Sequence, residues 1–495
     1  VQVFRPDHKI IAAFDSEVRI YGRETVEFVA DADGNYRLEV HSKWAGQPAG
    51  HYQIGITETR PATEDDRKLQ EARILDRESF ILYNQRKLDE AALLAGRSWK
   101  LYEAVLGTRH PDLAGPHNTL GWINRHKGDF VAAESHLQQA IQLTEQALGA
   151  EHPRVSEAVN SLGVLHYVRG EHSKAEPLFL RAIANFESAL GRDHYLVTLP
   201  LLNVANIREK RGDYAEAIRL SHRILTIQEQ ILGKESVGVA RRLQALAGLY
   251  ERVGDFAMAE SLHGRTLTLM EKLYGAQSLD VSVELENFGE FCLNKGDYVR
   301  AGSMFERSFT IRENLYPSGH ASIAYALYEL ANLSRTQGND AEAEPLYLRA
   351  VEMWERTAGP SFADIPLALQ GLATISGARG DDAKAEALYL RALRIQEQQF
   401  DATHPSVALT LHELANIQRE RGQFLLAQSS YERALKILEN SLGSNHPNVA
   451  SVLSNLSTLH AAKGGIAEAI TLQARVNAIN EHNLSLNLAS GSERW

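Results

Sequence analysis

The stretch that decides the fold runs from Gly380 to Gly422 and reads GDDAKAEALYLRALRIQEQQFDATHPSVALTLHELANIQRERG. It is one period of a 42-residue repeat, because the glycine returns at the same interval in both directions. We call these residues the reference glycines: Gly128, Gly170, Gly212, Gly254, Gly296, Gly338, Gly380, Gly422 and Gly464. A fixed period of this length indicates similar units that each pack on their neighbours. The 495 residues are therefore read as an array rather than as several ordinary domains.

Each repeat has the pattern of two helices joined by a turn at the reference glycine. Apolar residues eight and five positions before the glycine, such as Leu372 and Ile375, share one face of a first helix. A small residue seven positions before it and an alanine five positions after it, such as Ala373 and Ala385, let the helices approach closely. The glycine suits the left-handed residue that ends a helix. Repeats are joined by Leu-Gly-x-x-His-Pro, in which glycine ends one helix and proline opens the next. This link occurs at 106–111, 148–153 and 442–447.

The first 63 residues have a different pattern, which predicts a small antiparallel β domain. Short runs rich in β-branched and aromatic residues alternate with turn signals such as Pro6-Asp7 and Asp33-Gly34. The runs are 1–5, 10–14, 25–29, 36–41 and 52–58. Either earlier strands precede Val1, so that the chain is a fragment or a processed form, or one sheet edge is exposed or covered by helices. We predict three segments: a β-sandwich-like domain over 1–63, helical repeats over 64–484, and a C-terminal tail or linker over 485–495.

Composition argues against several classes of function. A net charge of −11 argues against nucleic acid, which needs a basic face. The single cysteine, Cys292, excludes an intrachain disulfide and a cysteine metal cluster. Every apolar run is too short to span a bilayer, which predicts a soluble protein and leaves the cytoplasm and export both open. Because phosphate-loop, zinc and nucleophile motifs are missing, we expect no cofactor, no metal and no catalytic residue, and an enzyme is the least favoured class.

The repeat pattern resembles the tetratricopeptide repeat. In the quoted stretch, Tyr389 and Ala392 stand at that family's aromatic and following alanine positions. The usual period is about 34 residues, and the longer period with LGxxHP links resembles the kinesin-light-chain class. This resemblance covers about 67–482 and implies a mostly α fold: a right-handed α-solenoid of about ten helix-turn-helix repeats after the small antiparallel β domain. The first repeat is degenerate, because Arg86 occupies the glycine position. The family resemblance also implies a non-catalytic scaffold that binds a protein or peptide in its concave groove.

A second resemblance covers the two ends of the chain. GNYRLEV at 34–40 and GHYQIGITETRPAT at 50–63 resemble the β domain that precedes such repeats in bacterial proteins ending in a caspase-like CHAT peptidase domain. The segment 481–494 resembles the entry into that peptidase. The alternative function is therefore the regulatory or sensor region of such a peptidase, whose catalytic domain is absent from this chain. Cys292 stands at a repeat position on a helix, so that family's His–Cys dyad is not assigned here.

Charged and histidine residues recur at fixed places in the repeat. An arginine eleven positions after the glycine and a glutamate seventeen after it, such as Arg181 and Glu145, predict inter-repeat ion pairs or hydrogen bonds. A lysine or arginine directly before the glycine, in seven of nine repeats, could bind an acidic partner; stabilisation of the helix end is the favoured interpretation. The link histidines lie a repeat apart, which favours capping or packing over metal binding. They are His110, His152, His194, His320, His404 and His446.

Binding residues are expected where the repeats differ. In this repeat class the first helices line the concave surface, and their variable positions here are rich in amides, aromatics and arginines. Amides can hold an extended backbone, and aromatics and arginine favour interface hot spots. The predicted peptide-binding residues are Asn118, Trp122, Arg125, Asn160, Tyr167, Asn206, Tyr328, Asn332, Arg335, Asn416 and Arg419. The alternative is that they are solvated residues of a spacer, which is hardest to accept for Trp122. Partner identity, oligomeric state and occupancy of the groove by the chain's own tail are left open.

Overall fold

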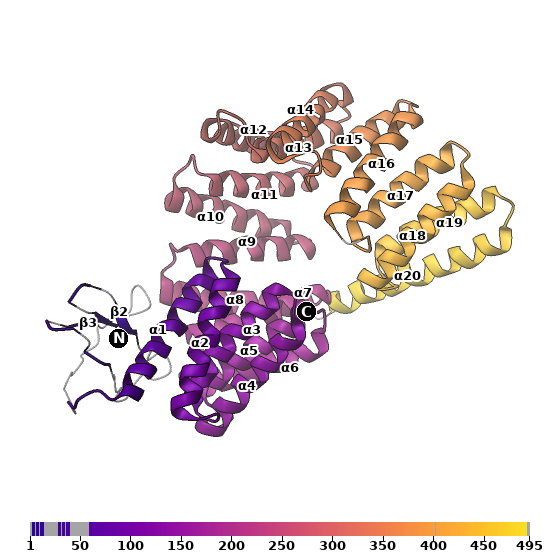
Figure 1. The fold of residues 1–495 in the computed structure, drawn as a ribbon. Coiled ribbons are helices and arrows are strands. Elements are labelled where there is room, and N and C mark those ends of the chain that lie inside the picture. The colour runs from indigo at the N-terminus through magenta and orange to yellow at the C-terminus, as the bar shows by residue number, and fades with distance from the viewer. Residues whose placement is uncertain are drawn as a thin grey trace. The chain divides into compact units, whose positions relative to one another are not determined.

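The computed structural model describes residues 2–4, 6–8, 10–13, 28–30, 32–34, 36–39, 59–400 and 402–492. Within these residues the chain is mostly α, with twenty α-helices paired into helix-turn-helix repeats of a solenoid (Figure 1). The ten pairs confirm the predicted fold class. The chain divides into two compact units, 1–262 and 263–495, and each is described by itself. None of the described helices is long and apolar enough to cross a membrane.

The N-terminal unit contains four helix pairs and the whole of the next first helix. Its α-helices are α1 (Glu64–Asn84), α2 (Leu88–Leu106), α3 (Ala114–Lys127), α4 (Phe130–Leu148), α5 (Pro153–Val168), α6 (His172–Leu190), α7 (Thr198–Lys210), α8 (Tyr214–Leu232) and α9 (Val237–Arg252). Short 3-10 helices, η1 (Pro111–Leu113) and η2 (Tyr195–Val197), precede α3 and α7. Helix α10 (Phe256–Tyr274) begins in this unit and ends in the next.

The C-terminal unit contains the last five pairs, and the α9–α10 pair crosses the boundary between the units. They are α11 (Leu279–Lys295) with α12 (Tyr298–Leu315), α13 (Ala321–Thr336) with α14 (Asp340–Ala358), α15 (Ile365–Ala378) with α16 (Asp382–Gln399), α17 (Pro405–Glu420) with α18 (Phe424–Leu442), and α19 (Pro447–Ala462) with α20 (Ile466–Ser492). Helix α20 continues through residues 485–492, which the sequence assigns to a tail or linker. The three-segment division of the chain stays a prediction.

The turn inside each pair depends on a left-handed backbone. Gly128, for example, has φ of 80°, and its N–H bonds the carbonyl of Arg125. In the first pair Arg86 adopts φ of 63° at the same place, although a side chain makes that conformation unfavourable. The degenerate first repeat therefore keeps the turn geometry of the others without their glycine.

The core lies between the two helices of each pair and between neighbouring pairs. The alanines five positions after the glycine are fully buried in eight of nine repeats, and the ninth, Ala469, is nearly so. On the facing first helix, a Cβ added at Gly163 would lie 2.6 Å from the ring of Phe179, and one at Gly289 would lie 2.5 Å from Phe305. The small residues are thus needed because a large side chain from the second helix fills the space above them, as the sequence predicted.

At the N-terminus, strands β1 (Gln2–Phe4), β2 (Ile10–Ala13) and β3 (Arg37–Glu39) form an antiparallel sheet in the order β2-β1-β3. Residues 28–30 are not in a strand; Val29 instead exchanges backbone hydrogen bonds with the side-chain amide of Gln70 on α1. The expected strand at 52–58 lies outside the described residues. Three of the five expected strands are therefore observed, and Gln70 ties the adjoining segment to the first helix.

Candidate functional site

The regular charges of the repeat hold neighbouring second helices together. The arginine eleven positions after the glycine pairs with the glutamate seventeen positions after the preceding glycine, and Arg223 and Glu187 approach to 2.7 Å. The same ion pair joins Arg181–Glu145, Arg307–Glu271, Arg391–Glu355, Arg433–Glu397 and Arg475–Glu439. The predicted inter-repeat framework is confirmed, and these charges are not available as a binding site.

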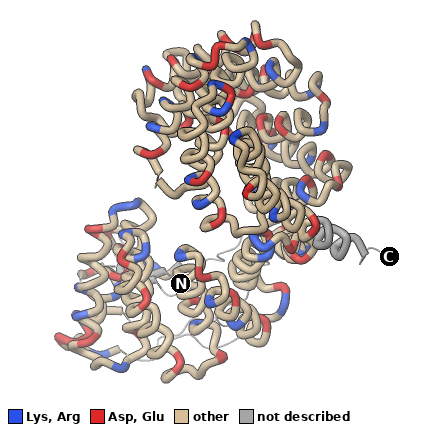
Figure 2. The backbone as a smooth tube through the Cα atoms, turned by 90° about the vertical axis from the view of Figure 1, so that its right-hand side faces the viewer, with Lys and Arg blue, Asp and Glu red and all other residues tan. Residues whose placement is uncertain are grey.

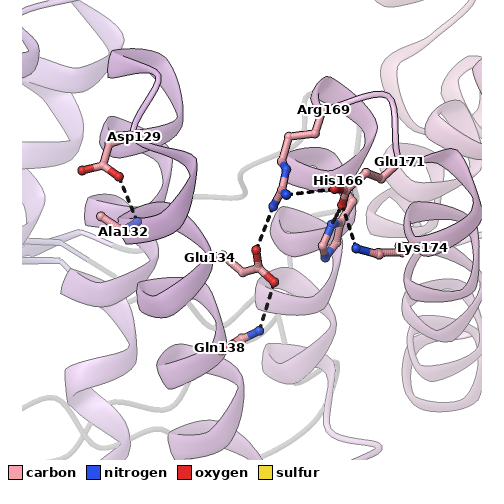
Figure 3. A network of polar contacts seen from close by, with 8 residues as sticks. All are labelled: Asp129, Ala132, Glu134, Gln138, His166, Arg169, Glu171 and Lys174. Atoms are coloured by element: carbon pink, nitrogen blue, oxygen red, sulfur yellow. Dashed lines mark hydrogen bonds and ion pairs between the residues drawn. The ribbon is translucent and has the colours of Figure 1, made fainter.

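The cations directly before the glycines form a second row of ion pairs. Arg169 contacts Glu134 on the preceding second helix at 2.8 Å and Glu171 in its own turn at 2.8 Å (Figure 3). Equivalent pairs are Arg211–Glu176, Arg379–Glu344 and Arg421–Glu386, and Lys127 pairs with Asp89. Acidic and basic residues are correspondingly interspersed along the helices (Figure 2). These cations are engaged inside the array, which argues against a stripe that binds an acidic partner.

The link histidines cap the helices that follow them. In His152 and His446, Nδ1 accepts a hydrogen bond from the backbone N–H two residues later, at 3.2 and 3.1 Å. His110, His194, His320 and His404 do the same. This confirms the capping interpretation. Across the described ranges, no group of three or more His, Cys, Asp or Glu residues could hold a metal ion. Cys292 is 1% exposed and belongs to the core.

All eleven predicted binding residues lie on first helices and are half-buried. They come from α3, α5, α7, α13 and α17, so they fall in both units and form several separate groups. Their half-buried state does not decide between solvated spacer and binding surface, so the assignment stays a prediction. Their contacts show which of them already have a structural role.

Trp122 packs between three successive first helices. Its Nε1–H donates a 2.9 Å hydrogen bond to Ser161 Oγ on α5, and its ring centroid lies 5.9 Å from Phe80 and 5.8 Å from Tyr83 on α1. Arg125 reaches the Tyr83 hydroxyl at 3.5 Å. These contacts explain Trp122 without any partner, so it is weaker support for binding than the sequence suggested.

Several predicted amides are likewise engaged within the array. Asn160 Oδ1 accepts from Asn203 at 3.1 Å, and Asn332 Oδ1 accepts from the Tyr347 hydroxyl at 2.6 Å. Asn416 Oδ1 accepts both from the hydroxyl of Tyr431, at 2.6 Å, and from Asn455, at 2.9 Å. These side chains orient neighbouring helices, and only their remaining donors and exposed edges can meet a ligand.

Three further predicted binding residues, Tyr167, Tyr328 and Asn118, differ in what surrounds their side chains. The Lys210 ammonium lies 4.8 Å from the centre of the Tyr167 ring. Tyr328 packs on the core of its unit, with ring centroids 5.8 Å from Tyr325 and 6.1 Å from Tyr347. Asn118 Oδ1 is buried without a hydrogen-bond partner within the part of the chain that the structure describes.

Two hollows lie in the C-terminal unit, along the first helices α11, α13 and α15. One has a volume of about 360 Å³ and the other about 290 Å³, and Tyr325 lines both. We call the two together the Tyr325 groove. The first is lined by Val283, Glu286, Asn287, Arg312, Ala321, Ser322, Tyr325, Phe362 and Asp364; the second by Glu290, Leu293, Asn294, Tyr325, Tyr328, Glu329, Asn332 and Leu367. Of the predicted binding residues, the groove brings together Tyr328 and Asn332.

One wall of the groove is a buried ion pair. Arg312 Nη2 contacts Glu286 at 2.6 Å, and its other nitrogens donate to Ser282 Oγ at 3.0 Å and to the Ser322 carbonyl at 2.6 Å. Burial raises the pKa of Glu286 to about 7, and the attraction of Arg312 offsets that effect only in part. The guanidinium is held on three sides, which fixes this wall of the first hollow.

The second hollow carries a further pair of acids. Glu329 is 3% exposed, and burial together with the charges of Glu290 and Glu286 raises its pKa to about 8. The Tyr325 hydroxyl donates to Glu290 at 3.3 Å. Burial also raises the pKa of Tyr328, to about 12. The groove therefore combines neutral tyrosine hydroxyls, carboxyl groups that resist ionisation, and apolar walls.

Sequence reasoning missed two central residues of the groove. Glu329 stands nine positions before its reference glycine and Tyr325 thirteen before it, and neither is among the eleven predicted binding residues. The available signal was a glutamate in the apolar stretch YALYELANL, where a charge has no reason to be unless it faces a hollow or a partner.

Comparison with known proteins agrees with the repeat architecture. A family model described as tetratricopeptide repeat matches residues 117–188, 196–272, 281–356, 364–440 and 406–481, and a second model of that description matches 72–112. A search of curated proteins gave no significant match.

Among solved structures, the apo form of RapI is 12% identical, with a TM-score of 0.54 over 74% of this chain and 97% of that one. BtubC (BKLC) from P. vanneervenii is 23% identical, with a TM-score of 0.41 over 47% and 92%. A Rap protein complexed with Competence and Sporulation Factor is 14% identical, with a TM-score of 0.45 over 84% and 99%. The RapI likeness indicates a shared fold and nothing about function.

The matched segments cover well over half of the chain, and they coincide with the helix pairs, the left-handed turns and the buried small residues described above. The chain is a member of the tetratricopeptide-repeat family.

Proposed function

We propose that the protein is a non-catalytic scaffold that binds a peptide or a protein segment along its first helices. The supporting observation is the Tyr325 groove, whose two adjoining hollows lie on three successive first helices. Its lining mixes apolar and aromatic walls with polar groups, as binding sites do. A non-catalytic role is in keeping with the matches, which are to repeats alone.

An exposed residue at the edge of the groove gives a clean test. Asn294 lines the second hollow and is exposed, so Asn294→Trp should fill that hollow without disturbing the core. Thr310→Trp adds the same ring to an exposed site on α12 outside the groove and serves as the matched control. Dodecapeptides selected from a random display library on the wild type are synthesised, and their affinities for the three proteins are measured by isothermal titration calorimetry.

We expect Asn294→Trp to weaken binding by about tenfold or more, because the ring occupies volume that the peptide needs. Thr310→Trp should bind as the wild type does. Equal affinity of all three proteins would show that peptides bind elsewhere, and failure to select any peptide would contradict the scaffold function.

A second candidate is the regulatory region of a caspase-like CHAT peptidase. It is favoured by the GNYRLEV and GHYQIGITETRPAT segments and by the hydrogen bonds that join Val29, close to the first of them, to Gln70 on α1. In that case the β segment and the repeats would transmit a binding event to an attached catalytic domain. Reading the gene beyond the codon for Trp495 tests this: a His–Cys peptidase supports it, and a stop codon there rules it out.

A further inference from the structure

Within the proposed function, on which this inference rests, we infer that the Tyr325 groove selects a peptide segment carrying an arginine or lysine side chain. The occupant is defined by charge complementarity: the two hollows are lined by the carboxyl groups of Glu286, Asp364, Glu290 and Glu329. Arg312 is the one cation among the described lining residues, and its guanidinium is already bound to Glu286, Ser282 and Ser322. Four carboxyl groups thus line the groove, against one cation that is already paired.

Glu329 differs from the regular glutamates of the array. The regular glutamates pair with an arginine of the next repeat, whereas Glu329 is held by the neutral side chains of Tyr325 and Asn332. A carboxyl group inside a hollow without a cation on it is costly to ionise, and a bound cation removes that cost. An entering guanidinium or ammonium group would therefore give Glu329 the positive partner that the arginine of the next repeat gives to the regular glutamates.

The aromatic walls suit such a group as well. Tyr325 and Tyr328 lie with ring centroids 5.8 Å apart at the junction of the hollows, and Phe362 lines the first. A cation over an aromatic face is attracted by the ring, and a planar guanidinium can stack on it while donating to carboxylates at its edge. The apolar side chains Val283, Leu293 and Leu367 can cover the methylene stem of the residue.

Binding of a cation to these acids should release protons. Several titratable or polar groups face Glu329. They are Glu286 and Glu290 from α11, Tyr325, Tyr328 and Asn332 from α13, and Tyr347 from α14; Arg312 of α12 pairs with Glu286. Because the pKa of Glu329 is raised to about 8, this carboxyl group is largely neutral at pH 7 and ionises when a cation approaches. The affinity for a cationic peptide should therefore increase between pH 6 and pH 8.5.

The test uses synthetic peptides selected on the full chain, together with analogues in which arginine is replaced by citrulline, or lysine by norleucine. The protein variants are Glu290→Gln with Glu329→Gln, and the control is Glu306→Gln on the exposed face of α12. Glutamine keeps the shape of the side chain, and circular dichroism checks that each variant is folded. Affinities are measured at pH 6, 7 and 8.5, and proton release is measured by titration calorimetry in two buffers of different ionisation enthalpy.

We expect the selected peptides to share a basic residue, and its neutral analogue to bind about tenfold to a hundredfold more weakly, as for a lost charge-assisted hydrogen bond. The double glutamine variant should bind the basic peptide more weakly by the same factor, and it should no longer distinguish that peptide from its neutral analogue. Glu306→Gln should behave as the wild type. A different result would overturn the charge selection alone. In that result Asn294→Trp still prevents peptide binding, but the affinity of the wild type depends neither on the peptide's charge nor on pH. The scaffold function would then stand. If no peptide binds at all, both proposals are wrong.

Discussion

The hydroxyl of Tyr347 on α14 donates a 2.6 Å hydrogen bond to Oδ1 of Asn332 on α13. Tyr431 and Asn416 form the same contact, also at 2.6 Å, two repeats later. Each bond joins the second helix of a pair to the variable face of its own first helix. The amide is thereby oriented before any ligand arrives.

Removing this hydroxyl should weaken the repeat without changing its packing. Tyr347→Phe leaves a buried ring of almost the same shape and deprives Asn332 of a donor, so we expect a loss of about 1 kcal/mol in the free energy of unfolding. Urea denaturation monitored by circular dichroism measures the change. Tyr298→Phe, at an exposed site, is the control and should be neutral. No loss in Tyr347→Phe would mean that the bond orients Asn332 without stabilising the fold.

Two glycines on first helices should respond oppositely to alanine. At Gly163 the added Cβ would lie 2.6 Å from the Phe179 ring, so Gly163→Ala should destabilise by about 1–3 kcal/mol through overpacking. At Gly248 an added Cβ would have no described atom within 4 Å apart from its chain neighbours and the backbone of its own helix, so Gly248→Ala should stabilise by about 0.5–1 kcal/mol because alanine favours the helix. Thermal unfolding of both variants tests the contrast. Similar effects at the two sites would contradict the close approach at Gly163.

Removing an arginine should cost more in a fully buried ion pair than in a partly exposed one. Arg312 and Glu286 are both almost fully buried, so Arg312→Ala leaves an uncompensated acid and should cost about 3–5 kcal/mol. Arg223 and Glu187 are each more than a fifth exposed, and Arg223→Ala should cost about 1 kcal/mol or less. Denaturation at low and high salt distinguishes them, since only the second effect should shrink strongly with salt. Equal costs would show that burial does not govern these pairs.

Acid should destabilise the fold through buried neutral histidines. Nδ1 of His117 lies 2.9 Å from Nδ1 of His136, and burial, with His136 nearby, lowers the pKa of His117 to about 4. Because this pKa lies below its unfolded value near 6.5, the stabilising contribution is present above pH 6.5 and is lost as the pH falls toward 4.

His117→Leu should therefore reduce the change in urea midpoint between pH 7.5 and pH 5, even if it lowers stability at both. His482→Leu, at an exposed position, is the comparison and should retain the wild-type pH dependence. An unchanged pH dependence in His117→Leu would assign the acid sensitivity to other histidines.

Alkaline pH should lower the stability of the fold through the buried acids of the Tyr325 groove. Burial and neighbouring charges raise the pKa of Glu329 from 4.5 to about 8. Its contribution to the free energy of unfolding is therefore fully present below pH 4.5 and is lost as the pH rises through about 8. Glu329→Gln should be less sensitive than the wild type between pH 6 and pH 8.5 in thermal unfolding. An unchanged pH dependence in the variant would mean that Glu329 is already ionised in the folded protein at pH 6.

The fold could be predicted because each structural requirement sits at one position of a repeated unit. Gly128, Ala133 and the capping His152 each act locally or against one neighbour, and the period supplies nine independent instances of the pattern. The arginine–glutamate pairs could be anticipated as framework for the same reason.

The binding face was less predictable, because its contacts run between first helices of different repeats. Trp122 reads as an exposed aromatic in the sequence, yet Ser161 and Phe80 on neighbouring helices account for it. Glu329 belongs to a hollow formed by three helices, and its burial depends on residues about forty positions away in either direction. A single repeat does not contain this information.

Arg86 makes the first helix pair less stable than the pairs inside the array. Its left-handed backbone costs about 1–2 kcal/mol that a glycine would not, and in a one-dimensional stack such a penalty concentrates fluctuations in the unit that carries it. We expect the α1–α2 hairpin to open before the interior repeats, and the segment around Val29, which Gln70 joins to α1, to be released with it. The chain would then unravel in one direction, from the β segment inward.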